Sequence, residues 1–259
     1  MRMSRMHMGD LGAQLGHRLE RSSPIIRTRV LCVLATLLAP PQVTLAQVAD
    51  APLKPADGAV ILAGAILFAA PHVLRINDEP PACAPCDRAA VPWFDRWAIA
   101  EPRTLWESVS TTAVVGIGLF AGWDLAEHRA PDPAVAHVAV LAQSAALALG
   151  AVEVTKALVG RNRPVLYTGQ AVEAARSLDS RRSWPSGHTA TATALATSYL
   201  LSVNAPEAAA PTWQQGVLLL ASAGVGAMRV AAARHFPSDV ACGAVFGVLS
   251  ALVVHGFRF

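Results

Sequence analysis

The sequence predicts an all-α protein, a polytopic transmembrane bundle of about five to six helices with its functional site at one membrane face. Three observations predict this fold. First, 53% of the 259 residues are hydrophobic and only 15% are charged, and the mean hydropathy is +0.40. Second, the apolar residues form a series of helix-length segments. Third, charged residues gather in short islands at the ends of these segments. Together the observations indicate an integral membrane protein.

Residues 1–46 form an N-terminal leader. An Arg-rich stretch at 1–29 precedes an apolar run at 30–38, and Thr44 and Ala46 provide small residues at the positions that a signal peptidase reads. We expect a signal peptide cleaved after Ala46, and an uncleaved signal anchor is the alternative. The leader holds most of the excess positive charge, so the basic isoelectric point does not indicate a nucleic-acid partner.

Residues 47–103 form the second part of the chain. The apolar stretch 58–74 has the minimum length for a span, and we expect it to lie in the interface or to span half the membrane. The loop that follows contains Cys83 and Cys86. This pair could be a disulfide, a redox motif or half of a zinc site. We favour a disulfide, because no second ligand pair follows and an extracytoplasmic loop is oxidising.

Residues 104–259 form the transmembrane core. Its apolar segments are free of charge at their centres and are rich in Ala, Val, Leu and Gly, which predicts spans at 105–123, 134–155, 189–204, 213–232 and 240–257. Their apolar character extends nearly all round each helix. A soluble protein would need polar outer faces instead.

Three charged islands lie between residues 156 and 239. The first extends from Lys156 to Pro164 and includes Arg163, the second is Trp184-Pro-Ser186-Gly187-His188, and the third extends from Arg229 through His235 to Asp239. Two histidines, a carboxylate and several cations are the groups needed to hold and transfer a phosphoryl group. We expect the helices to bring all three islands to one rim of the bundle.

The third island contains the candidate nucleophile. Pro237 suits the first turn of a helix, which places Asp239 within reach of one ring nitrogen of His235 and leaves the other nitrogen free to attack phosphorus. His188 could protonate the leaving oxygen. Helix capping is the alternative role for His188, His235 and Asp239, although capping does not require three spaced islands.

The islands match the pattern K-x6-R-P, P-S-G-H and R-x5-H-x3-D, in this order, and the chain thereby resembles the superfamily of type 2 phosphatidic acid phosphatases and vanadium haloperoxidases. The resemblance implies a metal-independent phosphatase, without a cofactor, that forms a phosphohistidine. His235 would be the nucleophile, Asp239 its orienting partner and His188 the general acid. The remaining matched residues would bind phosphate: Lys156, Arg163, Ser186, Gly187 and Arg229. One departure is Met228, where the family often has Ser.

The implied substrate is a membrane lipid such as phosphatidic acid, phosphatidylglycerol phosphate or undecaprenyl pyrophosphate. The implied location is a bacterial inner membrane, with the site facing the periplasm. A cleaved signal followed by a complete span at 58–74 would instead put the islands in the cytoplasm, which is why we expect a half-span or an uncleaved leader. The sequence indicates no oligomeric state.

Other functions stay open. A vanadate-dependent haloperoxidase uses nearly the same residues but is typically a larger soluble protein, and a soluble acid phosphatase would need polar helix faces. A transporter or membrane scaffold would explain the spans but not the islands. Five further arginines are either topology anchors or part of the site: Arg161, Arg176, Arg181, Arg182 and Arg234.

Overall fold

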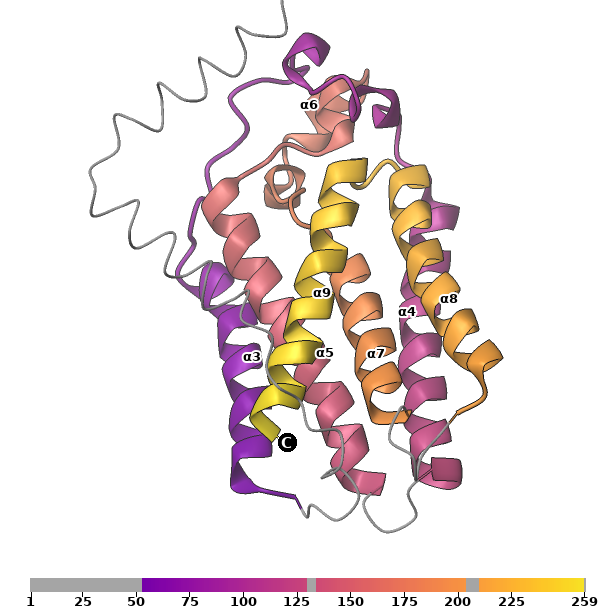
Figure 1. The fold of residues 1–259 in the computed structure, drawn as a ribbon. Helices are drawn as coiled ribbons and strands as arrows, with labels where there is room; N and C mark the ends of the chain where they lie inside the picture. Colours follow the sequence, from indigo (N-terminus) through magenta and orange to yellow (C-terminus); the bar gives the residue numbers. More distant parts are fainter. Residues whose placement is uncertain (1–52, 130–133, 204–209, 259) are drawn as a thin grey trace, which may run out of the picture. The chain divides into compact units, whose positions relative to one another are not determined.

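The computed structural model describes residues 53–129, 134–203 and 210–258. The predicted leader, residues 1–46, lies outside the described residues. The described chain is helical and contains no strand in these three ranges, which confirms the all-α prediction. The described residues form a bundle of six long helices (Figure 1): α3 (Pro55–Val73), α4 (Thr104–Asp124), α5 (Ala134–Val159), α7 (Gly187–Val203), α8 (Thr212–Ala231) and α9 (Pro237–Arg258).

The six helices alternate in direction. In Figure 1, α3, α5 and α8 run from the lower end of the bundle to the upper end, and α4, α7 and α9 run back. The connections at 74–103, 160–186 and 232–236 therefore all lie at the upper end, which we call the loop end. The long second connection carries the short helix α6 (Ala171–Ala174). This alternation places the three charged islands at one end of the bundle.

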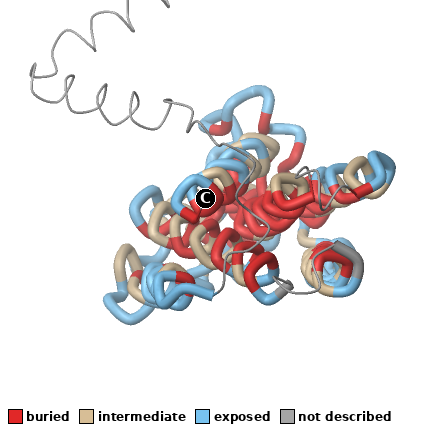
Figure 2. The backbone as a smooth tube through the Cα atoms, turned by 60° about the horizontal axis from the view of Figure 1, so that its bottom comes forward, coloured by how far each residue is buried: buried red, intermediate tan, exposed pale blue. Residues whose placement is uncertain are grey.

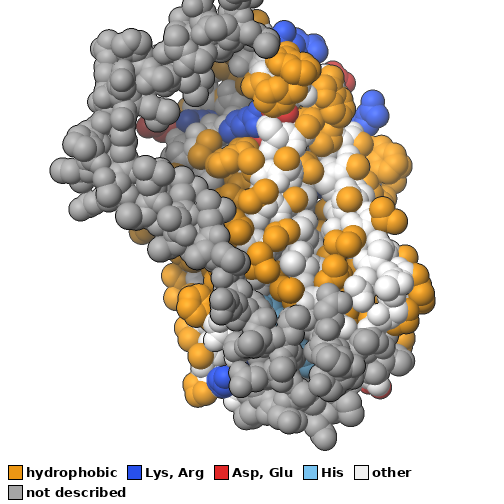
Figure 3. Space-filling view, in the orientation of Figure 1, with side chains coloured by type: hydrophobic (Ala, Val, Ile, Leu, Met, Phe, Trp, Pro, Cys, Tyr) orange, Lys and Arg blue, Asp and Glu red, His pale blue; other side chains and the backbone are white. Residues whose placement is uncertain are grey.

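The predicted spans are confirmed as helices to within a few residues. Four of the described helices are long and apolar enough to cross a membrane: Pro55–Val73, Thr104–Glu127, Val135–Tyr167 and Pro237–Arg258. Helix α7 has only 17 residues, and α8 carries Gln214, Gln215 and Arg229. Hydrophobic side chains cover the flanks of the helices, and most visible Lys and Arg side chains lie toward the loop end (Figure 3). These features are those of a membrane protein.

Helix α3 packs along the length of α5. Near one end, Gln143 Nε2 donates to the Asp57 carboxylate at 2.9 Å, and beyond the other end Asn77 Nδ2 donates to the carbonyl of Ala157 at 3.1 Å. Between them the two backbones approach closely, because a Cβ atom at Gly64 would lie 2.6 Å from the Ala146 carbonyl oxygen. Small residues at such contacts allow helices to pack in a membrane. Helix α3, which has 19 residues, therefore packs against α5 along its whole length.

Helix α7 lies at the centre and contacts α4, α5, α8 and α9. Buried residues concentrate around this centre, as the red segments of Figure 2 show. The approach to α9 is close, since a Cβ atom at Gly247 would lie 2.4 Å from the Ala190 carbonyl oxygen. On the other side, the buried hydroxyl of Tyr199 donates to Asp124 at 2.6 Å. Helix α7, which begins in the second island, is therefore held from several sides along its length.

Candidate active site

The three islands meet at the loop end of the bundle. Lys156 lies in the last turn of α5, the segment from Ser186 to His188 spans the start of α7, and Arg229 lies in the last turn of α8. Asp239 lies in the first turn of α9. The second and third islands are in direct contact, because the Ser186 N–H donates to the Asp239 carbonyl at 2.9 Å. The predicted convergence of the islands is thus present in the structure.

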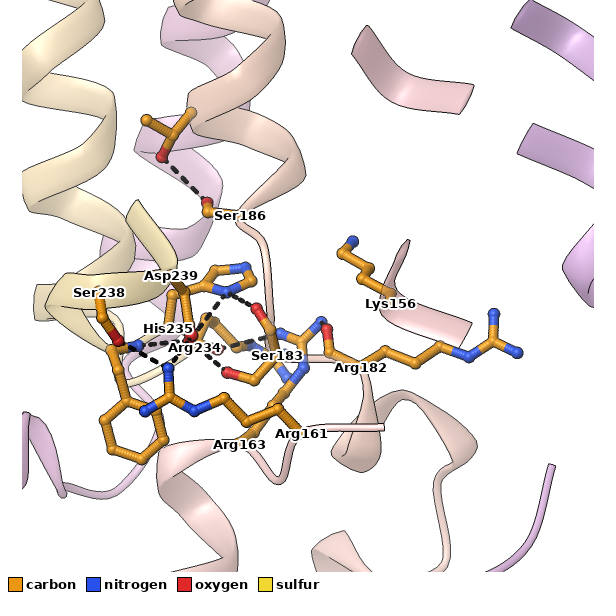
Figure 4. Close-up of polar contacts among 12 residues, drawn as sticks. Lys156, Arg161, Arg163, Arg182, Ser183, Ser186, Arg234, His235, Ser238 and Asp239 are labelled. Atoms are coloured by element: carbon orange, nitrogen blue, oxygen red, sulfur yellow. Dashed lines mark hydrogen bonds and ion pairs between the residues drawn. The ribbon is translucent and has the colours of Figure 1, made fainter. Parts of the chain in front are cut away.

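His235 lies in the loop between α8 and α9 and is only 1% exposed. Its Nδ1 atom is 2.7 Å from the carbonyl oxygen of Ser183 (Figure 4). A carbonyl can only accept, so Nδ1 carries the proton and Nε2 keeps its lone pair. Burial, and then the charges of Arg163, Lys156 and Arg229, hold the pKa of His235 well below its usual value. The ring is therefore neutral, with one nitrogen free to act as a nucleophile.

Asp239 does not bond directly to the His235 ring, as the sequence suggested it would. Its Oδ2 atom is 3.7 Å from Nδ1, beyond hydrogen-bond distance. The same oxygen accepts from the Ser183 hydroxyl at 2.6 Å and from the Phe236 N–H at 2.8 Å. Asp239 is at the third position of α9 and reaches back to cap its N-terminus, which turns the carboxylate away from the ring. Ser183 links the two groups, binding His235 through its carbonyl and Asp239 through its hydroxyl.

Arg161 joins Asp239 to the loop that precedes α4. Its Nη1 donates to Asp239, and its Nη2 donates to Asp95 at 2.7 Å. The Asp95 side chain is fully buried and also accepts from the Ser238 N–H at 3.0 Å. The guanidinium stacks over the Phe236 ring, 4.5 Å from its centroid. Of the two roles left open for Arg161, the structure shows it as part of the site, where it contacts Asp239 (Figure 4).

Two of the cations proposed to bind phosphate each have a carboxylate partner. Lys156 Nζ is 2.6 Å from Glu153, and Arg163 Nη2 is 2.7 Å from Asp179. Both cationic side chains are at least nine-tenths buried. The carboxylates offset the cost of burying these charges and fix their positions. Lys156 Nζ also lies beside the second island, 3.4 Å from the position of a Cβ atom at Gly187.

The second island forms the turn that begins α7. The first N–H groups of a helix have no intrahelical partner, so those at the start of α7 can bind an anion. The Ser186 hydroxyl accepts from Thr189 Oγ1 at 3.0 Å. On the far side of the turn, a Cβ atom at Gly243 of α9 would lie 2.5 Å from the Ser186 carbonyl oxygen. Helix α9 therefore packs directly beneath the candidate phosphate-binding turn.

Helix α4 contributes polar contacts that the sequence interpretation missed. Arg229 Nη1 donates to the Ser110 hydroxyl at 3.2 Å, and His188 Nε2 is 3.0 Å from Thr111 Oγ1. Glu107 pairs with Arg234 at 2.7 Å. These α4 residues have the spacing i, i+3 and i+4, which places them on one helical face. This spacing at the start of an apolar helix is the sequence signal that could have identified them.

The other open arginines divide between buried and exposed positions. Arg182 is buried and pairs with Asp78 at 3.2 Å. Arg176 pairs with Glu173 in an exposed contact, and Arg181 donates to the Glu79 carbonyl at the surface. Arg182 also lies 3.9 Å from Glu153, the partner of Lys156, whereas Arg176 and Arg181 lie on the outside of the loop end.

Cys83 and Cys86 form a disulfide in the structure. The Cys86 N–H donates to the Leu166 carbonyl at 2.8 Å, and Asn162 Nδ2 donates to the Cys86 sulfur at 3.4 Å. The disulfide therefore packs against the first island, where Asn162 stands between Arg161 and Arg163. Within residues 53–129, 134–203 and 210–258, no three His, Cys, Asp or Glu side chains gather where they could hold a metal ion.

Comparison with protein families gives one match to the chain. Residues 137–259 match the model described as the PAP2 superfamily. This C-terminal part of the chain is therefore similar to the PAP2 superfamily. The matched region extends from α5 to α9 and contains all eight residues predicted to form the site, whereas α3, the Cys-containing loop and α4 lie outside it. Comparisons with curated proteins and with solved structures gave no match. The match to the PAP2 superfamily supports a phosphatase-type, hydrolytic activity.

Proposed function

We propose that this protein is a metal-independent phosphatase that hydrolyses a lipid phosphate or pyrophosphate through a phosphohistidine at His235. One observation carries the proposal. His235 is buried and neutral, and its Nδ1 donates to the Ser183 carbonyl at 2.7 Å. The positive charges of Arg163, Lys156 and Arg229 lower the pKa of its ring. A histidine that serves only to pack or cap does not need a free Nε2 among buried cations.

The first chemical step transfers the phosphoryl group to the enzyme. The lone pair of His235 Nε2 attacks phosphorus, a P–N bond forms, and the P–O bond to the leaving group breaks. His188 gives its proton to the departing oxygen and becomes neutral. Lys156, Arg163 and Arg229 balance the charge on the three equatorial oxygens, and the N–H groups at the start of α7 add donors. The Ser183 carbonyl stabilises the proton on Nδ1 as the ring gains positive charge.

The second step releases phosphate. Water attacks phosphorus from the side that the leaving group vacated, and neutral His188 takes a proton from this water. The P–N bond breaks and its electron pair returns to His235 Nε2. Phosphate leaves, and both histidines have regained their starting protonation states. The positive charge required throughout comes from Arg and Lys side chains, and hence the scheme needs no metal ion.

A lipid substrate is supported by the position of the site. The islands lie where apolar helices end, at the level of the lipid headgroups in a membrane protein. Exposed aromatic side chains occur at the same end, with Trp93 81% and Trp97 70% exposed, and such residues favour the membrane interface. A phosphate at this level can reach the site while its tails stay in the bilayer. Phosphatidic acid, phosphatidylglycerol phosphate and undecaprenyl pyrophosphate all meet this description.

We place the loop end on the periplasmic side of a bacterial inner membrane, so that the site can reach lipids of the outer leaflet. Since α3 starts at the end opposite the loops (Figure 1), Pro55 would then lie on the cytoplasmic side. This arrangement supports a complete α3 span and an uncleaved leader, the alternative to cleavage after Ala46. Labelling a single Cys introduced beside Lys54 with a membrane-impermeant reagent tests it, because labelling in intact spheroplasts would place this end outside.

The experiment that tests the function is phosphate release by purified protein in detergent with EDTA present. The three lipids are offered separately to the wild-type protein and to His235→Ala, with thermal unfolding as the control for folding. We expect release from at least one lipid, undiminished by EDTA and abolished in the variant. Undiminished release by folded His235→Ala, or no release from any lipid, would reject the proposal. Vanadate binding without hydrolysis would favour the haloperoxidase alternative.

A further inference from the structure

The first turns of α4 carry a polar strip that faces the site. The strip consists of Glu107, Ser110 and Thr111, within a helix that is otherwise mainly apolar. It contacts Arg234, Arg229 and His188, respectively. The strip lies outside the region that matches the PAP2 superfamily, which begins at residue 137. These contacts therefore come from a part of the chain to which the family match assigns no role.

The hydrogen bonds of the strip fix which atoms donate. The Ser110 hydroxyl donates to the Glu107 carbonyl at 2.8 Å, and it accepts from Arg229 at 3.2 Å. A guanidinium can only donate, so the direction of this second bond is certain. Thr111 repeats the arrangement, because its hydroxyl donates to the same Glu107 carbonyl at 3.1 Å. A hydroxyl has a single proton, and Thr111 Oγ1 is therefore left as an acceptor.

That acceptor lies 3.0 Å from His188 Nε2. For a hydrogen bond to form, the proton must be on Nε2, and the neutral ring then has its lone pair on Nδ1. We propose that Thr111 is a positioning residue for His188, holding it in the Nε2–H tautomer so that Nδ1 exchanges the catalytic proton. The inference rests on the proposed function, in which His188 is the general acid.

The two histidines are consequently held in opposite tautomers. His235 carries its proton on Nδ1, facing the Ser183 carbonyl, while His188 carries its proton on Nε2, facing Thr111. When His188 is protonated, Thr111 still accepts from Nε2, and Nδ1–H is the donor to the leaving oxygen. Without the Thr111 oxygen the ring can rotate or adopt the other tautomer, which reduces the fraction of molecules ready to deliver a proton. The contact lies at an exposed position, so water can replace part of it.

Leaving groups of different basicity test this role. An alkyl phosphate such as phosphatidic acid needs a proton on its leaving oxygen, whereas p-nitrophenyl phosphate has a leaving group stable as an anion. We compare Thr111→Val, which keeps the shape and removes the hydroxyl, with Thr111→Ser, which keeps the hydroxyl. Thr112→Val is the matched control, since Thr112 is the next residue on α4 and is exposed. The parameter is kcat/KM, which reports the steps through departure of the leaving group.

For Thr111→Val we expect kcat/KM to fall roughly 10- to 100-fold with phosphatidic acid and less than about 3-fold with p-nitrophenyl phosphate. Thr111→Ser should recover most of the loss, and Thr112→Val should match the wild-type protein. An equal loss on both substrates, or no loss on phosphatidic acid, would overturn the inference. The wild-type protein is assayed alongside, and its failure to hydrolyse either substrate would count against the proposed function instead.

Discussion

Asp95 provides a stringent test of how the site is held together, because it lies in a loop far from the islands in sequence. Its carboxylate accepts from Arg161 at 2.7 Å, from the Ser238 N–H at 3.0 Å and from the Ser238 hydroxyl at 2.5 Å. It therefore caps the N-terminus of α9 and holds Arg161 against Asp239. Replacing Asp95 should loosen the support of the third island without touching any group that contacts phosphate.

The magnitude follows from burial, since the Asp95 side chain is 0% exposed and that of Arg161 is 22% exposed. Asp95→Ala removes one partner of a buried ion pair, which typically costs about 3–5 kcal/mol in the free energy of unfolding. Asp95→Asn keeps one acceptor but loses the charge, and we expect a loss of about 1.5–3 kcal/mol. For a protein of this size, each kcal/mol lowers the melting temperature by roughly 2–4 °C.

The assay combines thermal unfolding in detergent with phosphate release from the best lipid substrate. Asp87→Asn is the matched control, because Asp87 is exposed in the same loop and accepts from a nearby group, the Ala89 N–H, at 2.8 Å. We expect Asp95→Asn to lower kcat roughly 10- to 100-fold, with a smaller effect when Arg161→Gln is already present. If Asp95→Ala and Asp87→Asn unfolded at the same temperature and turned over equally, the reasoning would be refuted.

Two further predictions concern packing and pH. Gly243→Ala places a methyl group 2.5 Å from the Ser186 carbonyl oxygen, and we expect it to lower the free energy of unfolding by about 1–3 kcal/mol and to raise KM. Gly224→Ala is the control and should be harmless, because a Cβ atom there has nothing within 4 Å. Equal KM values for the two variants would contradict this prediction. Burial lowers the pKa of His235 in the folded protein, so the unfolded chain takes up a proton on this ring more readily. The contribution of neutral His235 to the free energy of unfolding is therefore complete above about pH 6.5. It falls in acid, by at most about 1.4 kcal/mol per pH unit. The difference in melting temperature between the wild-type protein and His235→Gln, measured from pH 8 to pH 5, should shrink; a constant difference would contradict it.

The sequence was sufficient to predict the bundle and the main groups of the site. Helix-length apolar segments predict the spans because a membrane leaves the chain few alternatives. The order and spacing of the three islands indicate their convergence, since antiparallel helices return to the same end. The sequence alone therefore assigns Lys156, Arg163 and Arg229 to one site with His188, His235 and Asp239.

The supporting contacts could not be predicted in the same way. The acceptor of His235 Nδ1 is a backbone carbonyl, that of Ser183, and a backbone atom has no sequence signature. The sequence correctly predicts that Asp239 lies in the first turn of α9. Its carboxylate oxygen was expected to bind the His235 ring, but it accepts from the Phe236 N–H instead. Asp95 and Thr111 reach the site across long sequence separations, from a loop and from a helix that the islands do not include. Only the fold brings these residues together.

The most direct test of the central claim is to locate the covalent intermediate. Protein is mixed with substrate labelled in the transferred phosphoryl group, quenched in alkali, in which phosphohistidine survives, and digested for peptide mapping. We predict label on His235, stable in alkali and lost in acid, and no label in a folded His235→Ala variant. Label on another residue, or phosphate release that persists in His235→Ala, would contradict the mechanism.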